Sequence, residues 1–167
     1  MAIPEFDSWR NELMLTGRIA QDGDSSDTWE KSEAQAGRYL GLLEMARGVY
    51  EKRVFQALLD SMQVEDDYEV YETTIGVIFS FPPEQFGSYL VECFASFIER
   101  DPERAGDFLS LMVNNSKSGE ANLHEFKRAL RNTTQANRKA IALFIKAQEK
   151  SGWLDTKRGW YDDALHG

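Results

Sequence analysis

The chain has 167 residues, of which 42% are hydrophobic and 12% aromatic, so it can form a buried core and is not a disordered chain. Its net charge of −9 opposes general nucleic-acid binding, and its single cysteine excludes an internal disulfide framework. No apolar run approaches the roughly 20 residues of a membrane span, and no apolar segment follows a basic N-terminal region, so we expect a cytoplasmic protein.

The first third of the sequence predicts three helices joined by polar loops. Apolar side chains recur at helical spacing over residues 7–20, 28–47 and 50–62. Asp27 can cap the second helix, with Glu30 three residues later as a capping box requires. Gly48 marks either a break before the third helix or a weak point in one longer helix.

The stretch from residue 65 to residue 113 holds the densest apolar and acidic patterning. Asp66 and Glu69 form a second capping box, which predicts a helix to about Phe81. The part from Thr73 onward is rich in β-branched and aromatic residues and would by itself indicate a buried strand. We favour the helix, because it has a cap and because no second strand is evident to pair with a lone strand. Such a helix is apolar nearly all round and should be the buried central element.

Prolines delimit the helices that follow. Pro82 and Pro83 end one helix and begin the next, which spans residues 84–99 with the clearest apolar face of the chain. Asp101 then caps a helix whose first position is Pro102.

The last third of the sequence predicts two more helices and a docked tail. Residues 114–119 are expected to form a loop, a short helix follows, and Thr134 opens another helix that stops at Gly152. The tail is too aromatic to be free, so we expect it to dock on the domain. Its apolar residues are Trp153, Leu154, Trp160 and Tyr161.

These elements predict an all-α fold. Helix starts near Asp66, Asp101 and Thr134 lie 35 and 33 residues apart, which is the period of stacked helix-turn-helix units. We therefore expect stacked antiparallel helix pairs in one HEAT-like, α-solenoid-like domain over residues 1–167. Its helical-repeat core should span about residues 65–150.

Charge is distributed unevenly along the chain. Residues 1–83 hold 16 acids and 7 bases, whereas residues 84–167 hold 12 of each. An acidic region attracts basic proteins and speeds their association, although acidity also serves solubility alone. Between Lys117 and Arg158 there are 10 bases and 4 acids. We expect these bases to neutralise the acidic front half rather than to bind nucleic acid, because exposed aromatics are not interleaved with them.

One acidic patch is the candidate partner-binding site. It consists of Glu65, Asp66, Asp67, Glu69 and Glu72, with Tyr68 among them. The acids can dock a basic protein, or they can be helix caps on a solvated face, since carboxylates favour helix N-termini. A metal or general-acid role is disfavoured, because no histidine or other base accompanies them in the sequence.

A second acidic run is close to a calcium-binding loop. The residues at its positions 1, 3, 5, 7, 9 and 12 are Asp22, Asp24, Ser26, Thr28, Glu30 and Glu33. Position 6 of that loop needs glycine, but here it is Asp27, which serves better as a helix cap. We expect no metal and no other cofactor.

The residues that most often do chemistry are isolated in this sequence. Cys93 lies on the apolar face of its helix, so a buried structural thiol is expected rather than a nucleophile. His124 and His166 are not clustered and form neither a zinc site nor a triad. We therefore predict a protein that is not an enzyme.

The order of segments after residue 65 resembles a known family. An Asp-Asp-Tyr helix start is followed by an apolar helix, a proline break and an amphipathic helix; then come an Asp-Pro-Glu-Arg cap and a helix ending in Leu-Met-Val-Asn-Asn. This order is similar to the small HEAT-like immunity proteins of bacterial polymorphic toxin systems, most of all the immunity protein 30 type, over residues 65–150.

The resemblance implies a cytoplasmic antidote that binds and blocks one cognate toxin domain without catalysis. A basic nuclease toxin would fit the acidic surface. On this hypothesis Asp66, Asp67, Tyr68, Glu69 and Glu72 are the first residues to test. Two alternatives stay open: a helical-repeat adaptor that binds a protein or peptide, and an enzyme whose site is assembled from residues distant in the sequence.

Overall fold

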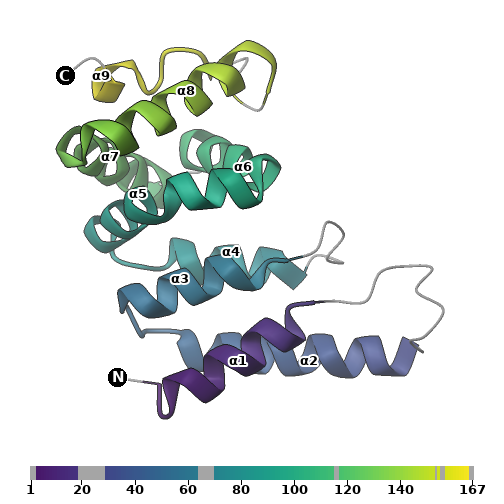
Figure 1. The fold of residues 1–167 in the computed structure, drawn as a ribbon. Coiled ribbons are helices and arrows are strands. Elements are labelled where there is room, and N and C mark those ends of the chain that lie inside the picture. Colours follow the sequence, from purple (N-terminus) through teal and green to yellow (C-terminus); the bar gives the residue numbers. More distant parts are fainter. Residues whose placement is uncertain are drawn as a thin grey trace. The chain divides into compact units, whose positions relative to one another are not determined.

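The computed structural model describes residues 3–18, 29–63, 70–114, 117–152, 154 and 157–165. These residues form nine α-helices and no strand, which confirms the predicted all-α fold (Figure 1). None of the described helices is both long and apolar enough to cross a membrane. The chain divides into two compact units, Met1–Phe81 and Pro82–Gly167, here called unit 1 and unit 2. The single domain and the repeat core over residues 65–150 stay predictions.

Unit 1 contains the first four helices. They are α1 (Phe6–Thr16), α2 (Trp29–Ala46), α3 (Lys52–Ser61) and α4 (Val70–Phe79). Helices α1 and α2 run antiparallel, because contacts that advance along α1 retreat along α2. The indole Nε1 of Trp9 donates to the carbonyl oxygen of Leu42 at 3.0 Å, and Gln35 Nε2 donates to the carbonyl oxygen of Thr16 at 3.1 Å.

Helix α1 ends at Thr16, four residues before the predicted end at residue 20. Gly17 follows it and packs so closely on α3 that a Cβ atom there would lie 2.3 Å from the carbonyl oxygen of Ser61. The hydroxyl of Tyr71 donates a hydrogen bond to the carbonyl oxygen of Gly17, and Gln35 Nε2 donates one to the carbonyl oxygen of Thr16. Carbonyls that a helix leaves unpaired at its end thus find tertiary partners, which local sequence does not reveal.

Helix α4 is the segment for which a strand was the alternative, and it is helical. It contacts α2 and α3. Thr74 Oγ1 lies 2.8 Å from the hydroxyl of Tyr39, which also lies 2.7 Å from Ser61 Oγ, so a buried polar cluster joins three helices. The helix expected to be the buried central element is buried on one side only: Tyr71, Thr74, Val77 and Ile78 are buried, whereas Glu72 and Gly76 are exposed. Gly48 has a left-handed backbone (φ 77°) and separates α2 from α3. The chain therefore breaks at Gly48 and does not continue as one longer helix.

Unit 2 contains the other five helices. They are α5 (Pro83–Arg100), α6 (Pro102–Asn114), α7 (Lys117–Asn132), α8 (Gln135–Ser151) and α9 (Asp162–Leu165). Helix α5 contacts α6, α7 and α8. Its Phe94 ring meets Phe126 of α7 edge-to-face, with centroids 5.6 Å apart, and Phe144 of α8 at 6.2 Å. The predicted apolar face of α5 is therefore the centre of this core.

The predicted start signals of unit 2 are confirmed. Asp101 Oδ1 accepts the backbone N–H of Arg104 at 2.9 Å, directly before α6. Thr134 Oγ1 accepts the backbone N–H of Asn137 at 3.2 Å, directly before α8. The Asp66 cap lies outside the described residues, as do Asp27 and most of the calcium-like loop.

The loop predicted over residues 114–119 is too long. Helix α6 includes Asn114, and α7 already begins at Lys117. Ser118 and Gly119 suggested a loop, but the first turn of a helix leaves its N–H groups without intrahelical partners, so these residues cost less there than in a helix interior.

The tail docks on unit 2, as predicted. Leu154 and Tyr161 are buried, and the Tyr161 hydroxyl donates to the carbonyl oxygen of Leu109 on α6 at 2.8 Å. Trp160 is 45% exposed, and Trp153 lies outside the described residues. Glu149 of α8 holds the turn that carries the tail, since its Oε1 accepts the N–H of Gly159 at 2.8 Å.

Candidate partner-binding surfaces

The structure describes only one residue of the acidic patch that the sequence predicts as a binding site. Glu65, Asp66, Asp67, Tyr68 and Glu69 lie outside the described residues. Glu72 is described: it is exposed in the first turn of α4, where a carboxylate suits the helix dipole. The patch therefore stays a predicted binding site, with one residue placed on the surface.

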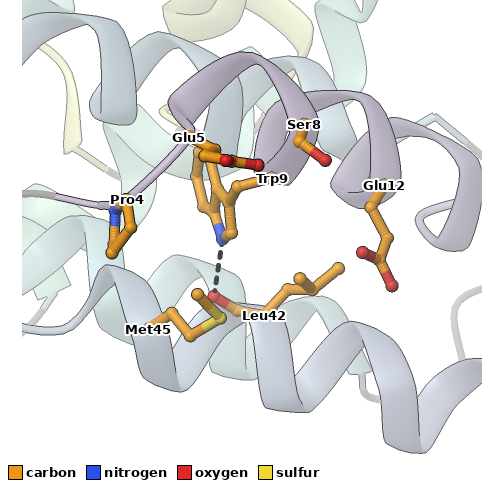
Figure 2. A pocket seen from close by; sticks show the side chains of 7 residues that line it. All are labelled: Pro4, Glu5, Ser8, Trp9, Glu12, Leu42 and Met45. Carbon is orange, nitrogen blue, oxygen red and sulfur yellow. Dashed lines mark hydrogen bonds between the residues drawn. The ribbon is translucent and has the colours of Figure 1, made fainter.

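A hollow of about 310 Å³ lies between α1 and α2 of unit 1 (Figure 2). We call it the α1–α2 groove; it is lined by Pro4, Glu5, Ser8, Trp9, Glu12, Leu42 and Met45. Trp9 and Leu42 are buried at its base, where the indole hydrogen bond fixes the ring. Met45 is 48% exposed beside them. An aromatic base with an accessible methionine is typical of protein-binding surfaces.

Carboxylates lie on the α1 side of this groove. Glu5 is exposed and has no ion pair with another described residue, whereas Glu12 is paired with Arg38 of α2. Glu5 is also the one non-glycine residue with positive φ in the described part of the chain, at φ 50° and ψ 57°. A left-handed backbone costs such a residue about 1 kcal/mol, and strain of this kind concentrates at functional sites.

A second hollow, of about 530 Å³, lies between α5 and α7 of unit 2. Its lining is mainly polar and comprises Glu84, Ser88, Val91, Glu92, Arg128, Ala129, Asn132, Thr133 and Thr134. The side chain of Asn137 joins two of the lining residues, because its Nδ2 donates to the carbonyl oxygen of Val91 at 2.9 Å and to Thr133 Oγ1 at 3.1 Å.

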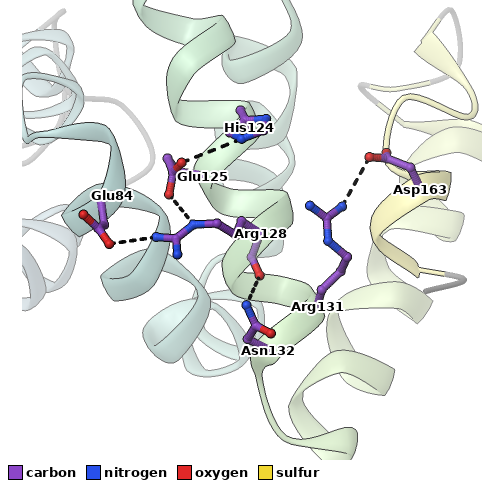
Figure 3. A network of polar contacts seen from close by, with 7 residues as sticks. All are labelled: Glu84, His124, Glu125, Arg128, Arg131, Asn132 and Asp163. Atoms are coloured by element: carbon purple, nitrogen blue, oxygen red, sulfur yellow. Dashed lines mark hydrogen bonds and ion pairs between the residues drawn. The ribbon is translucent and has the colours of Figure 1, made fainter.

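The charged groups at this second hollow already have partners (Figure 3). Arg128 lies between two carboxylates, with Nη2 3.0 Å from Glu84 Oε1 and Nε 2.6 Å from Glu125 Oε2. Hydrogen bonds to Glu125 and then to Glu84 raise the pKa of the Arg128 guanidinium. This hollow therefore offers a ligand few unpaired charges, and it is the weaker candidate.

Some bases of the basic stretch pair with acids of the same unit. Lys127 and Arg131 both reach Asp163, at 2.8 and 3.4 Å, and Lys146 reaches Asp162 at 2.8 Å. These ion pairs fasten α9 to α7 and α8. The expectation that the bases neutralise the acidic front half stays a prediction.

Acid should weaken this fastening. The hydrogen bond from Lys127, with the charges of Lys127 and Arg131, holds the pKa of Asp163 below its ordinary value. A lowered pKa means that the stabilisation is complete above the unfolded pKa, about 3.9, and is lost as pH falls through the folded pKa. We expect Asp163→Asn to lower the free energy of unfolding by less than about 1 kcal/mol at pH 6, because the pair is exposed.

Urea titrations of wild type and Asp163→Asn at pH 6 and at pH 2 measure this effect. The difference between the two proteins should shrink as the pH falls from 6 to 2, because a carboxylate with a lowered pKa loses its stabilising effect progressively below the unfolded pKa. An equal difference at both pH values would show that Asp163 does not act through its charge.

The described residues hold no group of three or more His, Cys, Asp or Glu that can bind a metal. Cys93 is buried on α5, as predicted, and His124 is exposed with Nε2 3.8 Å from Glu125 Oε1. His166 lies outside the described residues. Asp107 of α6 is half-buried, and burial raises the pKa of its carboxyl, opposed by the charge of Arg104.

No protein-family model matches the chain, and no curated protein or solved structure is significantly similar to it. A proposal about the function of this protein therefore rests on its sequence and structure. The resemblance to immunity proteins stays a prediction.

The α1–α2 groove was not predicted from the sequence. Its two sides come from segments 33 positions apart, and Glu5 and Glu12 look like ordinary acids of a solvated helix. The one residue in the sequence that could have indicated the groove is Trp9, which helical spacing places on the inner face with Leu13. A tryptophan near the edge of an apolar face marks a site where one end of the ring seeks a polar partner.

Proposed function

We propose that this protein is a cytoplasmic immunity protein that binds a basic toxin domain and blocks it by occlusion, without catalysis. The observation that carries the proposal is the division of charge between the two units. Unit 1 holds 16 acids and 7 bases, a net of −9, and unit 2 holds 12 of each. The net negative charge of the protein thus comes from one compact unit.

A concentrated negative field suits the capture of a cationic protein. It raises the rate of encounter and disfavours acidic competitors, which an antidote to a single toxin requires. Unit 2 carries no net charge, and its Lys127, Arg128 and Lys146 pair with acids of the same unit, so unit 1 supplies the long-range attraction. The resemblance of residues 65–150 to immunity proteins agrees with this role.

The test is co-expression with a toxin C-terminal domain encoded by the adjacent upstream open reading frame. We expect the wild-type protein to rescue growth and to bind the purified toxin domain in a salt-sensitive manner. Glu72→Lys, alone or with Asp67→Lys, should slow association about tenfold at low ionic strength, with a smaller effect at high salt.

Glu103→Lys is the matched control, because Glu103 is also an exposed first-turn acid, but of α6 in unit 2. It makes the same change in net charge and should slow association less than Glu72→Lys does, because it lies in the unit that carries no net charge. Binding without rescue would instead favour the adaptor role. Salt-independent binding would contradict the electrostatic part of the proposal.

A further inference from the structure

The α1–α2 groove combines an apolar base with an exposed carboxylate. Trp9 and Leu42 form the base, and Met45 stands beside it with about half of its surface exposed. Glu5 lies on the α1 side of the hollow, where it is exposed and has no ion pair with another described residue (Figure 2). A side chain that enters this hollow meets apolar surface, and its neighbours meet a carboxylate.

The wall of the groove is fixed before any partner arrives. The hydrogen bond from Trp9 to Leu42 spans the two helices at the hollow, and the Glu12–Arg38 ion pair joins them again one turn further along α1. Phe6 packs on Trp9 with ring centroids 5.6 Å apart. The guanidinium of Arg53 in α3 lies over the Phe6 ring, 4.4 Å from its centroid. A site that is rigid when empty loses little conformational freedom on binding.

The outer stripe of α1 extends this surface. Glu5, Ser8, Glu12 and Leu15 follow one another at helical spacing, and Leu15 is 69% exposed at the far end. A stripe of two carboxylates that ends in one exposed leucine is complementary to a segment that carries both basic and apolar side chains. Because unit 1 has a net charge of −9, it attracts a segment with a positive net charge.

From these features we infer that the α1–α2 groove docks a basic segment of the protein partner. An apolar side chain of the segment enters the hollow onto Trp9 and Leu42, beside Met45. A lysine or arginine next to it pairs with Glu5. The identity of that partner as a toxin rests on the proposed function; the basic, partly apolar character of the segment rests on the groove alone.

The strained backbone of Glu5 agrees with this role. Glycine would occupy the left-handed conformation without strain, so folding alone favours glycine at this position. Glu5→Gly should therefore keep unit 1 folded while it removes the carboxylate, which separates loss of binding from loss of structure.

The first arm uses a short amphipathic peptide of lysine and leucine, and the same peptide with glutamate in place of lysine. The readout is the indole N–H resonance of Trp9 in nitrogen-edited NMR spectra of the full chain, assigned with Trp9→Phe. The lysine peptide should shift this resonance and the glutamate peptide should not. Glu5→Lys, Glu5→Gly and Met45→Ser should each weaken binding about tenfold, because each removes a side chain that contacts the peptide.

Two control variants separate the groove from the general field. Glu33→Lys changes the net charge as Glu5→Lys does, at an exposed position of α2 that does not line the groove. Leu143→Ser matches Met45→Ser on the exposed side of α8. Each should change peptide affinity less than about twofold. Equal losses in variants and controls, or an unmoved Trp9 resonance, overturn the inference.

The second arm repeats the growth rescue with the groove variants. Loss of rescue in Glu5→Lys and Met45→Ser, but not in the controls, supports docking of the toxin in the groove. Rescue by every groove variant overturns it and leaves the proposed function intact. If the wild type itself does not rescue, the proposed function fails and the peptide arm alone decides the docking site. A Trp9 shift that depends on protein concentration without peptide assigns the groove to a second copy and overturns the inference.

Discussion

Replacing Gly87 with alanine should destabilise unit 2 by about 3 kcal/mol, at the upper end of what overpacking costs. A Cβ atom at this position would lie 2.5 Å from the carbonyl carbon of Glu125 and 2.6 Å from its oxygen and from the backbone nitrogen of Phe126. These are backbone atoms of α7, so no side-chain rotation relieves the clash, and α5 and α7 have to separate. That movement would also open the Phe94–Phe126 contact.

Denaturant titration of wild type and Gly87→Ala measures the cost as a shift of the unfolding midpoint. Gly41→Ala is the matched control, because Gly41 is also helical but has no atom within 4 Å of its Cβ position. Alanine there should stabilise by up to about 1 kcal/mol through helix propensity. A Gly87→Ala protein as stable as the wild type would show that α5 and α7 are not packed this closely in solution.

The sequence predicted the elements that local chemistry determines. Residues 84–99 were expected to form one helix, and α5 spans Pro83–Arg100, because a proline start and the Asp101 cap fix both ends. Thr134 was likewise found at the start of α8. Caps and prolines act within one turn of the chain, so their effect is visible without knowledge of the fold.

Elements shaped by distant contacts were predicted less well. The end of α1 depends on Gly17 meeting Ser61 and on the hydroxyl of Tyr71, neither of which is adjacent in sequence. Burial of α4 was overestimated because its composition is apolar, whereas its placement against α2 and α3 decides which face is covered.

The candidate sites show the same division. The consecutive acids Glu65, Asp66 and Asp67 are conspicuous in the sequence and therefore predict a binding site. The groove requires Glu5 and Trp9 to lie opposite Met45, which only the antiparallel pairing of α1 and α2 brings about. No periodicity within either helix indicates that pairing.

Removal of the Tyr161 side chain should release the C-terminal segment. The ring is fully buried against Phe126, with centroids 6.1 Å apart, and its hydroxyl donates to the carbonyl oxygen of Leu109 at 2.8 Å. We expect Tyr161→Ala to lower the free energy of unfolding by about 3–5 kcal/mol, as for large aromatic truncations in cores. Tyr161→Phe keeps the ring and should cost about 1 kcal/mol for the lost hydrogen bond.

Trp160→Ala is the control for Tyr161→Ala, because the neighbouring ring is 45% exposed and stacks mainly with Lys157, 5.3 Å from its centroid. It should cost less than about 1 kcal/mol, in the range of surface changes. Urea denaturation measures all three variants. Equal losses for Trp160→Ala and Tyr161→Ala would contradict the docking of the tail through Tyr161.

Alkaline pH gives an independent test of the same contact. Burial, and then the charge of Glu149, raises the pKa of the Tyr161 hydroxyl well above its model-compound value of 10.0. The unfolded chain therefore loses this proton before the folded protein does, so stability is complete below pH 10 and falls as pH rises above it. Tyr161→Phe has no such proton and should lose less stability between pH 9 and pH 11 than the wild type. The gap between the two proteins should close over that interval, because the phenolate can form only where the tail has left Leu109.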